Sequence, residues 1–167
     1  MVNPEILREV MLENREEVMR REVIKRSISL DGFERQVLVG ARRAGKSYLM
    51  YGKIQELLAQ GHSWDEIVYL NFEDERLAGM ELNDLNKIFE VHAGLGGERP
   101  MLFLDEIQNI DGWEHFARRV ADSKLTVFIT GSNAKMLSVD VSAALGGRYM
   151  TREVFPMQFD EYLMSNG

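Results

Sequence analysis

Residues 40–47 read Gly40-Ala41-Arg42-Arg43-Ala44-Gly45-Lys46-Ser47 and match the pattern G-x-x-x-x-G-K-[ST] at every fixed position. The apolar run Val37–Val39 precedes this segment, and apolar residues at helical spacing follow it as far as Leu58. A strand, a glycine-bounded loop and a helix are therefore expected in this order. In that arrangement, successive backbone N–H groups and the positive end of the helix converge on one phosphate. The segment predicts a phosphate-binding loop.

The fixed positions of the loop have distinct physical roles. Gly40 and Gly45 can adopt backbone angles closed to other residues, and they place no side chain between the loop and a phosphate. Lys46 can reach the terminal phosphates as a point charge, and the Ser47 hydroxyl can bind a Mg²⁺ ion that bridges them. We therefore expect a nucleoside triphosphate with Mg²⁺ to bind here. The residues expected to contact it are Gly40, Ala41, Arg42, Arg43, Ala44, Gly45, Lys46, Ser47 and Tyr48.

The composition is that of one globular domain. Hydrophobic residues make up 45% and charged residues 28% of the 167 positions, so the chain can bury a substantial core. The net charge of −7 argues against a broad nucleic-acid-binding surface and leaves open only a local basic patch for DNA. The absence of cysteine excludes disulfides, and no structural metal is expected. The chain starts with charged residues and has no run of roughly 18 apolar residues, so we expect a cytoplasmic protein without a membrane span.

The N-terminal segment, residues 1–34, is predicted to be helical and to pack on the core or lead into it. Asn3-Pro4-Glu5 is typical of a helix start, with a capping side chain, a proline in the first turn and an acid near the positive end. Residues 4 to about 26 read as one or two charged helices. The basic residues near their end alternate with acids, which favours a solvated face over a contact with nucleic acid or a partner. These basic residues are Arg20, Arg21, Lys25 and Arg26.

Residues 35–167 alternate apolar segments with helical patterns. Strands are expected at 36–39, 67–72, 101–106, 125–130 and about 150–155. Strands that are apolar on both faces and alternate with helices indicate a parallel sheet covered on both sides. No repeat or internal linker interrupts this part of the sequence. It is predicted to form one α/β domain.

Two acids end the third expected strand. Asp105 can hold the magnesium shell opposite Ser47, and Glu106 can polarise a water for attack on the γ-phosphate. The alternative is that both acids only end a strand at the surface. Their position downstream of a phosphate-binding loop, after one intervening strand, favours the functional interpretation.

These motifs together resemble the ATPase core of a prokaryotic group of AAA+ proteins, which carries a GxRRxGKS loop and an LDEIQ strand. The resemblance covers residues 35–163. Besides the loop, it rests on YLNFED at 69–74, LDEIQ at 104–108, ITGSN at 129–133, LGGR at 145–148 and FPMQFDEY at 155–162.

The resemblance implies a three-layer αβα P-loop NTPase fold with a five-stranded parallel sheet of order 5-1-4-3-2. It implies a polar sensor among Thr130, Ser132 and Asn133, with Asn133 taken as the catalytic candidate beside Lys46 and Glu106. Arg148 stands where such proteins place an arginine near the γ-phosphate of the same or a neighbouring subunit. The alternative for Arg148 is a surface arginine in a glycine-rich turn.

The resemblance also implies that a helical lid, a winged-helix segment and a further C-terminal domain follow in the whole protein. The 167 residues stop where the lid would start, so a complete site is not expected within them. These absent domains, a protein partner or a second copy are the expected partners besides nucleotide.

The leading functional hypothesis is an Mg-dependent ATPase that binds ATP or ADP and drives a conformational change in attached domains. A P-loop small-molecule kinase and a nucleotide-gated binding switch with little turnover are the alternatives. A GTPase is disfavoured because no Asn-Lys-x-Asp segment is present. An ABC-type subunit is disfavoured because ALGG at 144–147 follows the acidic strand instead of preceding it.

A last hypothesis concerns Asn71 at the end of the second expected strand. Related ATPases use a polar residue at this place to hold the catalytic glutamate away from water, and Asn71 could donate to Glu106. The alternative is an asparagine that only bonds the neighbouring backbone.

Overall fold

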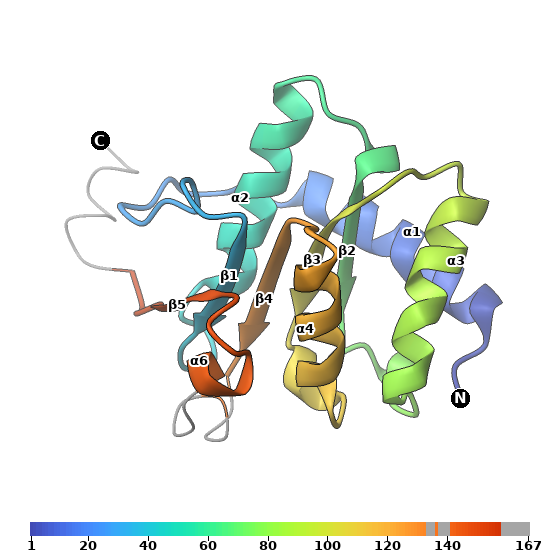
Figure 1. The fold of residues 1–167 in the computed structure, drawn as a ribbon. Helices are drawn as coiled ribbons and strands as arrows, with labels where there is room; N and C mark the ends of the chain where they lie inside the picture. Colours follow the sequence, from blue (N-terminus) through green and yellow to red (C-terminus); the bar gives the residue numbers. More distant parts are fainter. Residues whose placement is uncertain (133–135, 137–140, 158–167) are drawn as a thin grey trace.

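A computed structural model describes residues 1–132, 136 and 141–157 of the chain. Its centre is a five-stranded parallel sheet of order β2-β3-β4-β1-β5 (Figure 1). Read from the other edge, this is the predicted order 5-1-4-3-2, which is confirmed. The strands are β1 (Arg35–Val39), β2 (Ile67–Asn71), β3 (Met101–Asp105), β4 (Val127–Gly131) and β5 (Met150–Glu153).

Helices cover both faces of the sheet. Between β1 and β2 lies α2 (Lys46–Ala59), and α3 (Lys87–Gly94) and α4 (Trp113–Asp122) follow β2 and β3. In Figure 1, α3 and α4 lie on one face of the sheet and α2 on the other. The chain also has α1 (Pro4–Arg20) and the short α6 (Val141–Ala144), and it forms 3-10 turns at Trp64–Glu66, Glu75–Leu77, Leu82–Asn86 and Ile107–Asn109. The three-layer α/β fold is that of a P-loop NTPase.

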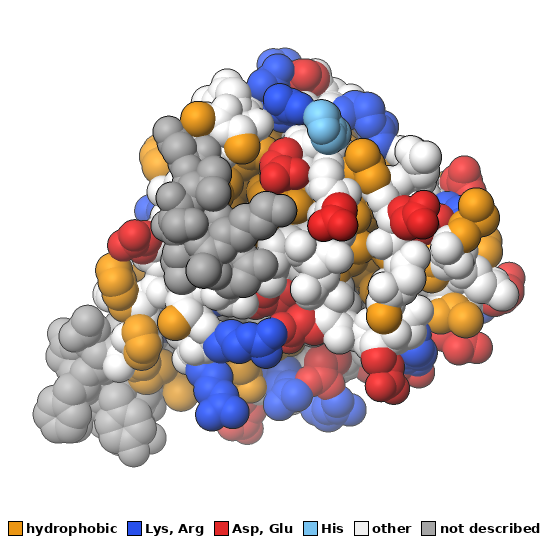
Figure 2. Space-filling view, turned by 90° about the horizontal axis from the view of Figure 1, so that it is seen from below, with side chains coloured by type: hydrophobic (Ala, Val, Ile, Leu, Met, Phe, Trp, Pro, Cys, Tyr) orange, Lys and Arg blue, Asp and Glu red, His pale blue; other side chains and the backbone are white. Residues whose placement is uncertain are grey.

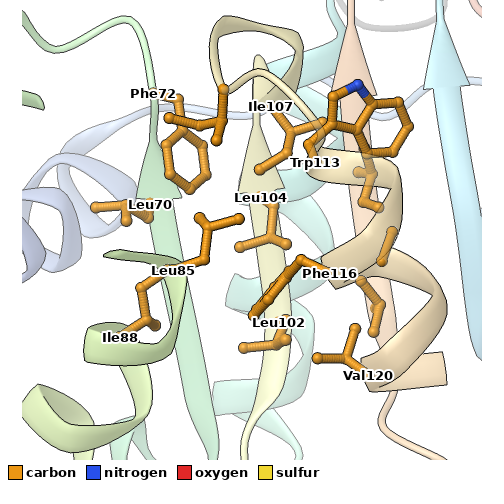
Figure 3. Close-up of a cluster of buried hydrophobic side chains, with 14 of the residues drawn as sticks. Leu70, Phe72, Leu85, Ile88, Leu102, Leu104, Ile107, Trp113, Phe116 and Val120 are labelled. Atoms are coloured by element: carbon orange, nitrogen blue, oxygen red, sulfur yellow. The ribbon is translucent and has the colours of Figure 1, made fainter. Parts of the chain in front are cut away.

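Alternation along the strands builds two hydrophobic clusters, because successive side chains point to opposite faces. Leu102 and Leu104 of β3 face α3 and α4, and Figure 3 shows them directed toward Leu85 and Phe116. Phe103 between them points to the α2 face, where its ring stacks on Phe128 of β4 at 4.9 Å. Strands β1 to β4 are therefore buried on both sides, as their continuous apolar sequences predicted, whereas the edge strand β5 is largely exposed.

Helix α1 covers the outer edge of the sheet at β2. It begins as predicted, with the Asn3 side chain accepting from the Glu5 N–H. Asn14 then accepts a 3.0 Å hydrogen bond from the backbone N–H of Asn71 in the edge strand. An edge strand whose free N–H is used by a helix is less available for pairing with another chain.

The prediction of helix as far as residue 26 is wrong, because α1 ends at Arg20. Residues 21–34 contain no helix and pass along α2. Gln55 of α2 donates to the carbonyls of Val18 and Arg21 and so uses acceptors that a continuing helix would need. A Cβ on Gly52 would lie 3.0 Å from Val23, so this segment lies directly against α2. Contacts with α2 therefore override the local helical pattern.

In the part of the chain that the structure describes, no helix has both the length and the apolar character needed to cross a bilayer.

Candidate functional site

The segment between β1 and α2 lies at the carboxyl edge of the parallel strands, at the bottom of Figure 1. Its backbone takes positive φ at Arg43 and Gly45, and α2 starts at the next residue, Lys46. A Cβ on Gly40 would lie 2.3 Å from the carbonyl oxygen of Val154, so only glycine fits there. Figure 2, which views the molecule from this edge, shows basic and acidic side chains interspersed among the described residues.

Lys46 is held inside this loop. Its side chain is buried, and Nζ donates 2.8 Å hydrogen bonds to the carbonyl oxygens of Gly40 and Ala41. Burial lowers the pKa of Lys46, and the nearby carboxylates of Glu106 and Asp105 act in the opposite direction. The ammonium group is therefore bound by loop carbonyls and attracted by the charge of two acids, and a phosphate oxygen could replace a carbonyl as its partner.

Arg26 supports the loop from outside. Its Nη1 donates to the Ala44 carbonyl at 2.8 Å, and its Nη2 donates to the Phe155 carbonyl at 2.7 Å. A Cβ on Gly45 would lie 2.9 Å from Nη1, so the guanidinium packs directly on the loop. For Arg26, the predicted role on a solvated helix face is wrong. Its partners lie 18 and 129 positions away in the chain, and no local pattern marks such a contact.

Asp105 is fully buried at the end of β3 and is surrounded by hydroxyl groups. Oδ1 accepts from Thr130 Oγ1 and Oδ2 accepts from the Tyr69 hydroxyl, each at 2.5 Å. Burial raises the pKa of Asp105, and hydrogen bonds from Ser47, Thr130 and Tyr69 oppose this effect. The hydroxyl groups therefore stabilise the ionised form of a buried carboxylate.

The oxygens of Ser47 and Asp105 fit a magnesium ion, because Mg²⁺ prefers oxygen ligands and usually keeps several waters and substrate phosphates. Among the described residues, no group of three or more His, Cys, Asp and Glu side chains could hold a metal alone. A metal at this place would therefore depend on bound phosphate for the rest of its ligands.

Glu106 follows β3 in the left-handed backbone region, with φ of 58°. Its Oε2 accepts hydrogen bonds from Ser132 Oγ at 2.7 Å and from Gln108 Nε2 at 2.6 Å. Its backbone N–H donates to Thr130 Oγ1 at 2.9 Å. A non-glycine residue in this region is uncommon and is found at functional sites. Ser132 and Gln108 therefore hold the carboxylate that the sequence assigned to water activation.

Asn71 has a different role from the one hypothesised. Its Oδ1 accepts from the backbone N–H of Glu73 at 2.9 Å, and among the described residues it makes no hydrogen bond with Glu106. Asn71 therefore bonds the neighbouring backbone, which was the alternative interpretation, and the contacts with Glu106 come from β4 and from the turn after β3.

Arg148 lies before β5, whose first residue, Met150, pairs with Gln36 near the start of β1. This is the amino edge of the sheet, opposite the loop. Its Nε donates to Asp122 Oδ1 at 2.7 Å. The expectation that Arg148 approaches the γ-phosphate of its own subunit is therefore wrong, because the length of the strands separates the two. A contact with the nucleotide of a neighbouring subunit stays a prediction.

Two of the remaining predicted residues lie on the surface of the site, and a third lies outside the described part of the chain. Arg42 is exposed and forms a 3.2 Å ion pair with Glu73, which links the loop to the segment after β2. Tyr48 is partly exposed, and its ring lies edge to face with that of Tyr51. Asn133 lies outside the described residues, whereas the other two sensor candidates, Thr130 and Ser132, both contact the acids.

Comparisons with known proteins agree with this geometry. Residues 33–163 match the family described as an AAA domain. An uncharacterized protein of Methanocaldococcus jannaschii is 37% identical over 166 residues, which are 98% of this chain and 36% of the relative. An uncharacterized protein of Haemophilus influenzae is 33% identical over 130 residues, which are 77% of this chain and 32% of the relative. The chain thus spans about a third of the length of these relatives.

Solved structures with low sequence identity share the fold. The ADP complex of Hsp104 from S. cerevisiae superimposes with a TM-score of 0.57 at 15% identity, covering 98% of this chain and 23% of that one. The closed state of Hsp104 with ATPγS and FITC casein gives 0.54 at 15% identity, covering 92% and 27%. The family match and the strand order together show that the chain belongs to the AAA domain family and forms an AAA+ P-loop ATPase core.

Proposed function

We propose that this chain is the Mg-dependent ATPase module of a larger protein, and that ATP hydrolysis drives a conformational change in the attached domains or in a partner. The observation that carries the proposal is the convergence of the loop lysine, the Ser47 hydroxyl and two buried acids at one edge of the sheet. Two segments far apart in the chain, at residues 46–47 and 105–106, supply these groups. Their residue types are those that phosphoryl transfer to water requires.

Each side chain of the site has a distinct role in the proposed hydrolysis. Lys46 exchanges a loop carbonyl for a phosphate oxygen, which keeps its charge partnered in a buried place. Ser47 and Asp105 would hold a Mg²⁺ ion, and the ion would supply charge neutralisation to the terminal phosphates. Glu106 keeps Oε2 on Ser132 and Gln108, so Oε1 is the oxygen that can orient a water. Thr130 connects the two acids, because it donates to Asp105 and accepts from the Glu106 N–H.

The partners of this module follow from the length of the relatives. The chain covers 36% and 32% of the two relatives, so most of each lies outside the ATPase core. A conformational change would act on those parts, on a protein partner or on a second copy. Arg26 can transmit a conformational change from the phosphate-binding loop to the segments that follow the core. It donates hydrogen bonds both to the loop and to Phe155, near the end of the described core.

A nucleotide-gated switch with little turnover is the second candidate. The observation that favours it is the pair of hydrogen bonds on Glu106, because two donors restrain the carboxylate and limit its movement toward a water. In this function, binding of ATP would change the conformation and a partner would be needed for hydrolysis.

Calorimetric titration with ATP, ADP and GTP in the presence of Mg²⁺ tests nucleotide binding by the 167-residue chain. Phosphate release by the chain and by the protein of full natural length, with and without DNA, tests turnover. We expect binding of ATP and ADP by both forms and faster hydrolysis by the longer one, because closing elements complete such sites. Absence of binding to any nucleotide would overturn the proposed function. Binding of ATP without turnover by either form would favour the switch.

A further inference from the structure

Tyr69 of β2 belongs to the site, although the sequence predicted no role for it there. In the pairing of β2 with β3, Asn71 lies level with Asp105, and Tyr69 is two residues earlier on the same face of the strand. A long side chain can reach such a diagonal neighbour. The Tyr69 hydroxyl does so and lies 2.5 Å from Asp105 Oδ2, with the side chain buried.

The direction of this hydrogen bond follows from the neighbouring distances. A second hydroxyl, that of Tyr51 on α2, lies 3.4 Å from the Tyr69 hydroxyl. Tyr69 has one hydroxyl hydrogen and two acceptors within reach, and the shorter contact to a charged acceptor is the stronger one. The hydrogen therefore points to Asp105, and Tyr51 can donate to the Tyr69 oxygen. The rings of Tyr51 and Tyr69 meet edge to face at 5.5 Å, which keeps both hydroxyl groups in place.

Asp105 is thereby held from two sides. Thr130 on β4 binds Oδ1 and Tyr69 on β2 binds Oδ2, so strands on both sides of β3 each supply one donor. Two donors on different oxygens define the plane of the carboxylate. A carboxylate has about four lone-pair sites, so the hydrogen bonds from Thr130, Tyr69 and Ser47 do not use all of them and do not prevent Asp105 from binding a metal.

We infer that Tyr69 is a positioning residue for magnesium, and that its hydroxyl holds the Asp105 carboxylate in the orientation in which Asp105 and Ser47 bind the ion. This inference rests on the proposed function. It differs from a packing role, because the ring of Tyr69 and its hydroxyl have separate effects. The ring fills space between β2 and α2. The hydroxyl contacts the charged carboxylate of Asp105 and the uncharged hydroxyl of Tyr51.

The variant Tyr69→Phe separates the two effects, since it keeps the ring and removes the donor. Binding of a fluorescent ATP analogue is measured in EDTA and then at increasing Mg²⁺. We expect the affinity in EDTA to stay within about twofold, and the Mg²⁺ concentration for half-maximal enhancement to rise by about tenfold or more, the usual effect of losing a group that orients a metal ligand. The electron paramagnetic resonance signal of Mn²⁺ with ATP gives a second measurement of metal affinity that needs no turnover.

Two matched variants serve as controls. Tyr51→Phe removes the neighbouring hydroxyl, which does not touch Asp105, and Tyr149→Phe removes a buried hydroxyl that donates to the Ala117 carbonyl. Both should keep the parental Mg²⁺ requirement. If Tyr69→Phe also keeps it, or if it loses affinity equally in EDTA and in Mg²⁺, the inference is overturned while the proposed function stands. Absence of nucleotide binding by the parental chain would instead overturn the proposed function.

Discussion

The hydroxyl of Ser132 donates a 2.7 Å hydrogen bond to Oε2 of Glu106 and so joins the end of β4 to the turn after β3. Gln108 donates to the same oxygen from the other direction. The carboxylate is thus held at one oxygen, in a residue that is only 8% exposed. This arrangement can either orient Glu106 for catalysis or restrain it, and a mutation distinguishes the two.

Ser132→Ala removes one donor and leaves the Gln108 contact. If Ser132 orients Glu106, the rate of hydrolysis should fall by about tenfold or more, because a hydrogen bond to a charged group contributes about 1.5–3 kcal/mol. ATP affinity should stay unchanged, because Ser132 is not expected to touch the phosphates. Steady-state phosphate release gives kcat and KM separately. A rise in kcat above the parental rate would show that Ser132 restrains Glu106 and would favour the switch.

Glu106→Gln should bind ATP as the parental chain does and lose hydrolysis by about 10²- to 10⁴-fold, because the amide keeps the shape of the side chain without the base. Binding is measured by calorimetry and turnover by phosphate release from the full-length protein. Glu114→Gln, in the first turn of α4, is the matched control and should retain the parental rate. Parental turnover in Glu106→Gln would contradict the water-activating role.

Lys46→Ala should weaken ATP binding by about 10- to 100-fold, the effect of removing a charged hydrogen bond worth about 1.5–3 kcal/mol. The fold should persist, because the Lys46 ammonium contacts loop carbonyls and not the hydrophobic clusters. Calorimetry gives the affinity, and circular dichroism checks the fold. Lys53→Ala, seven residues later on α2 with Asp31 as its partner, should bind as the parent does. Equal affinity of Lys46→Ala and the parent would refute the role of the loop.

Arg26→Ala should destabilise the chain by about 1–3 kcal/mol, since it leaves the carbonyls of Ala44 and Phe155 without their charged donor. For a domain of this size the melting temperature should fall by about 2–4 °C for each kcal/mol. ATP affinity should also decrease, because the loop loses an external support. Lys25→Ala removes the neighbouring positive charge and serves as the control. Unchanged melting and affinity in Arg26→Ala would mean that the contact has no effect on the loop.

The sequence by itself determined the parts of the site that are local in the chain. The loop from Gly40 to Ser47 and the pair Asp105-Glu106 were identified because each lies within a few residues and directly after an apolar strand. The start of α1 was identified for the same reason, since Asn3 caps a backbone N–H only two residues away. The sheet order came from the resemblance of the motifs to a known family, because strand pairing depends on contacts that no local segment contains.

The tertiary structure decided which side chains act on these groups. Tyr69 reaches Asp105 across 36 positions and Thr130 reaches it across 25, and both contacts exist only because β2 and β4 flank β3. The pairing of β5 with β1 likewise places Arg148 at the amino edge of the sheet, away from the loop. Helix α1 ends at Arg20, where Gln55 of α2 donates to the carbonyls of Val18 and Arg21, although the local pattern continues. The neighbours of a residue in the chain determine its conformational preference. Its partners in space depend on the order of the strands and on the direction of each side chain, and both are established only when distant segments pack together.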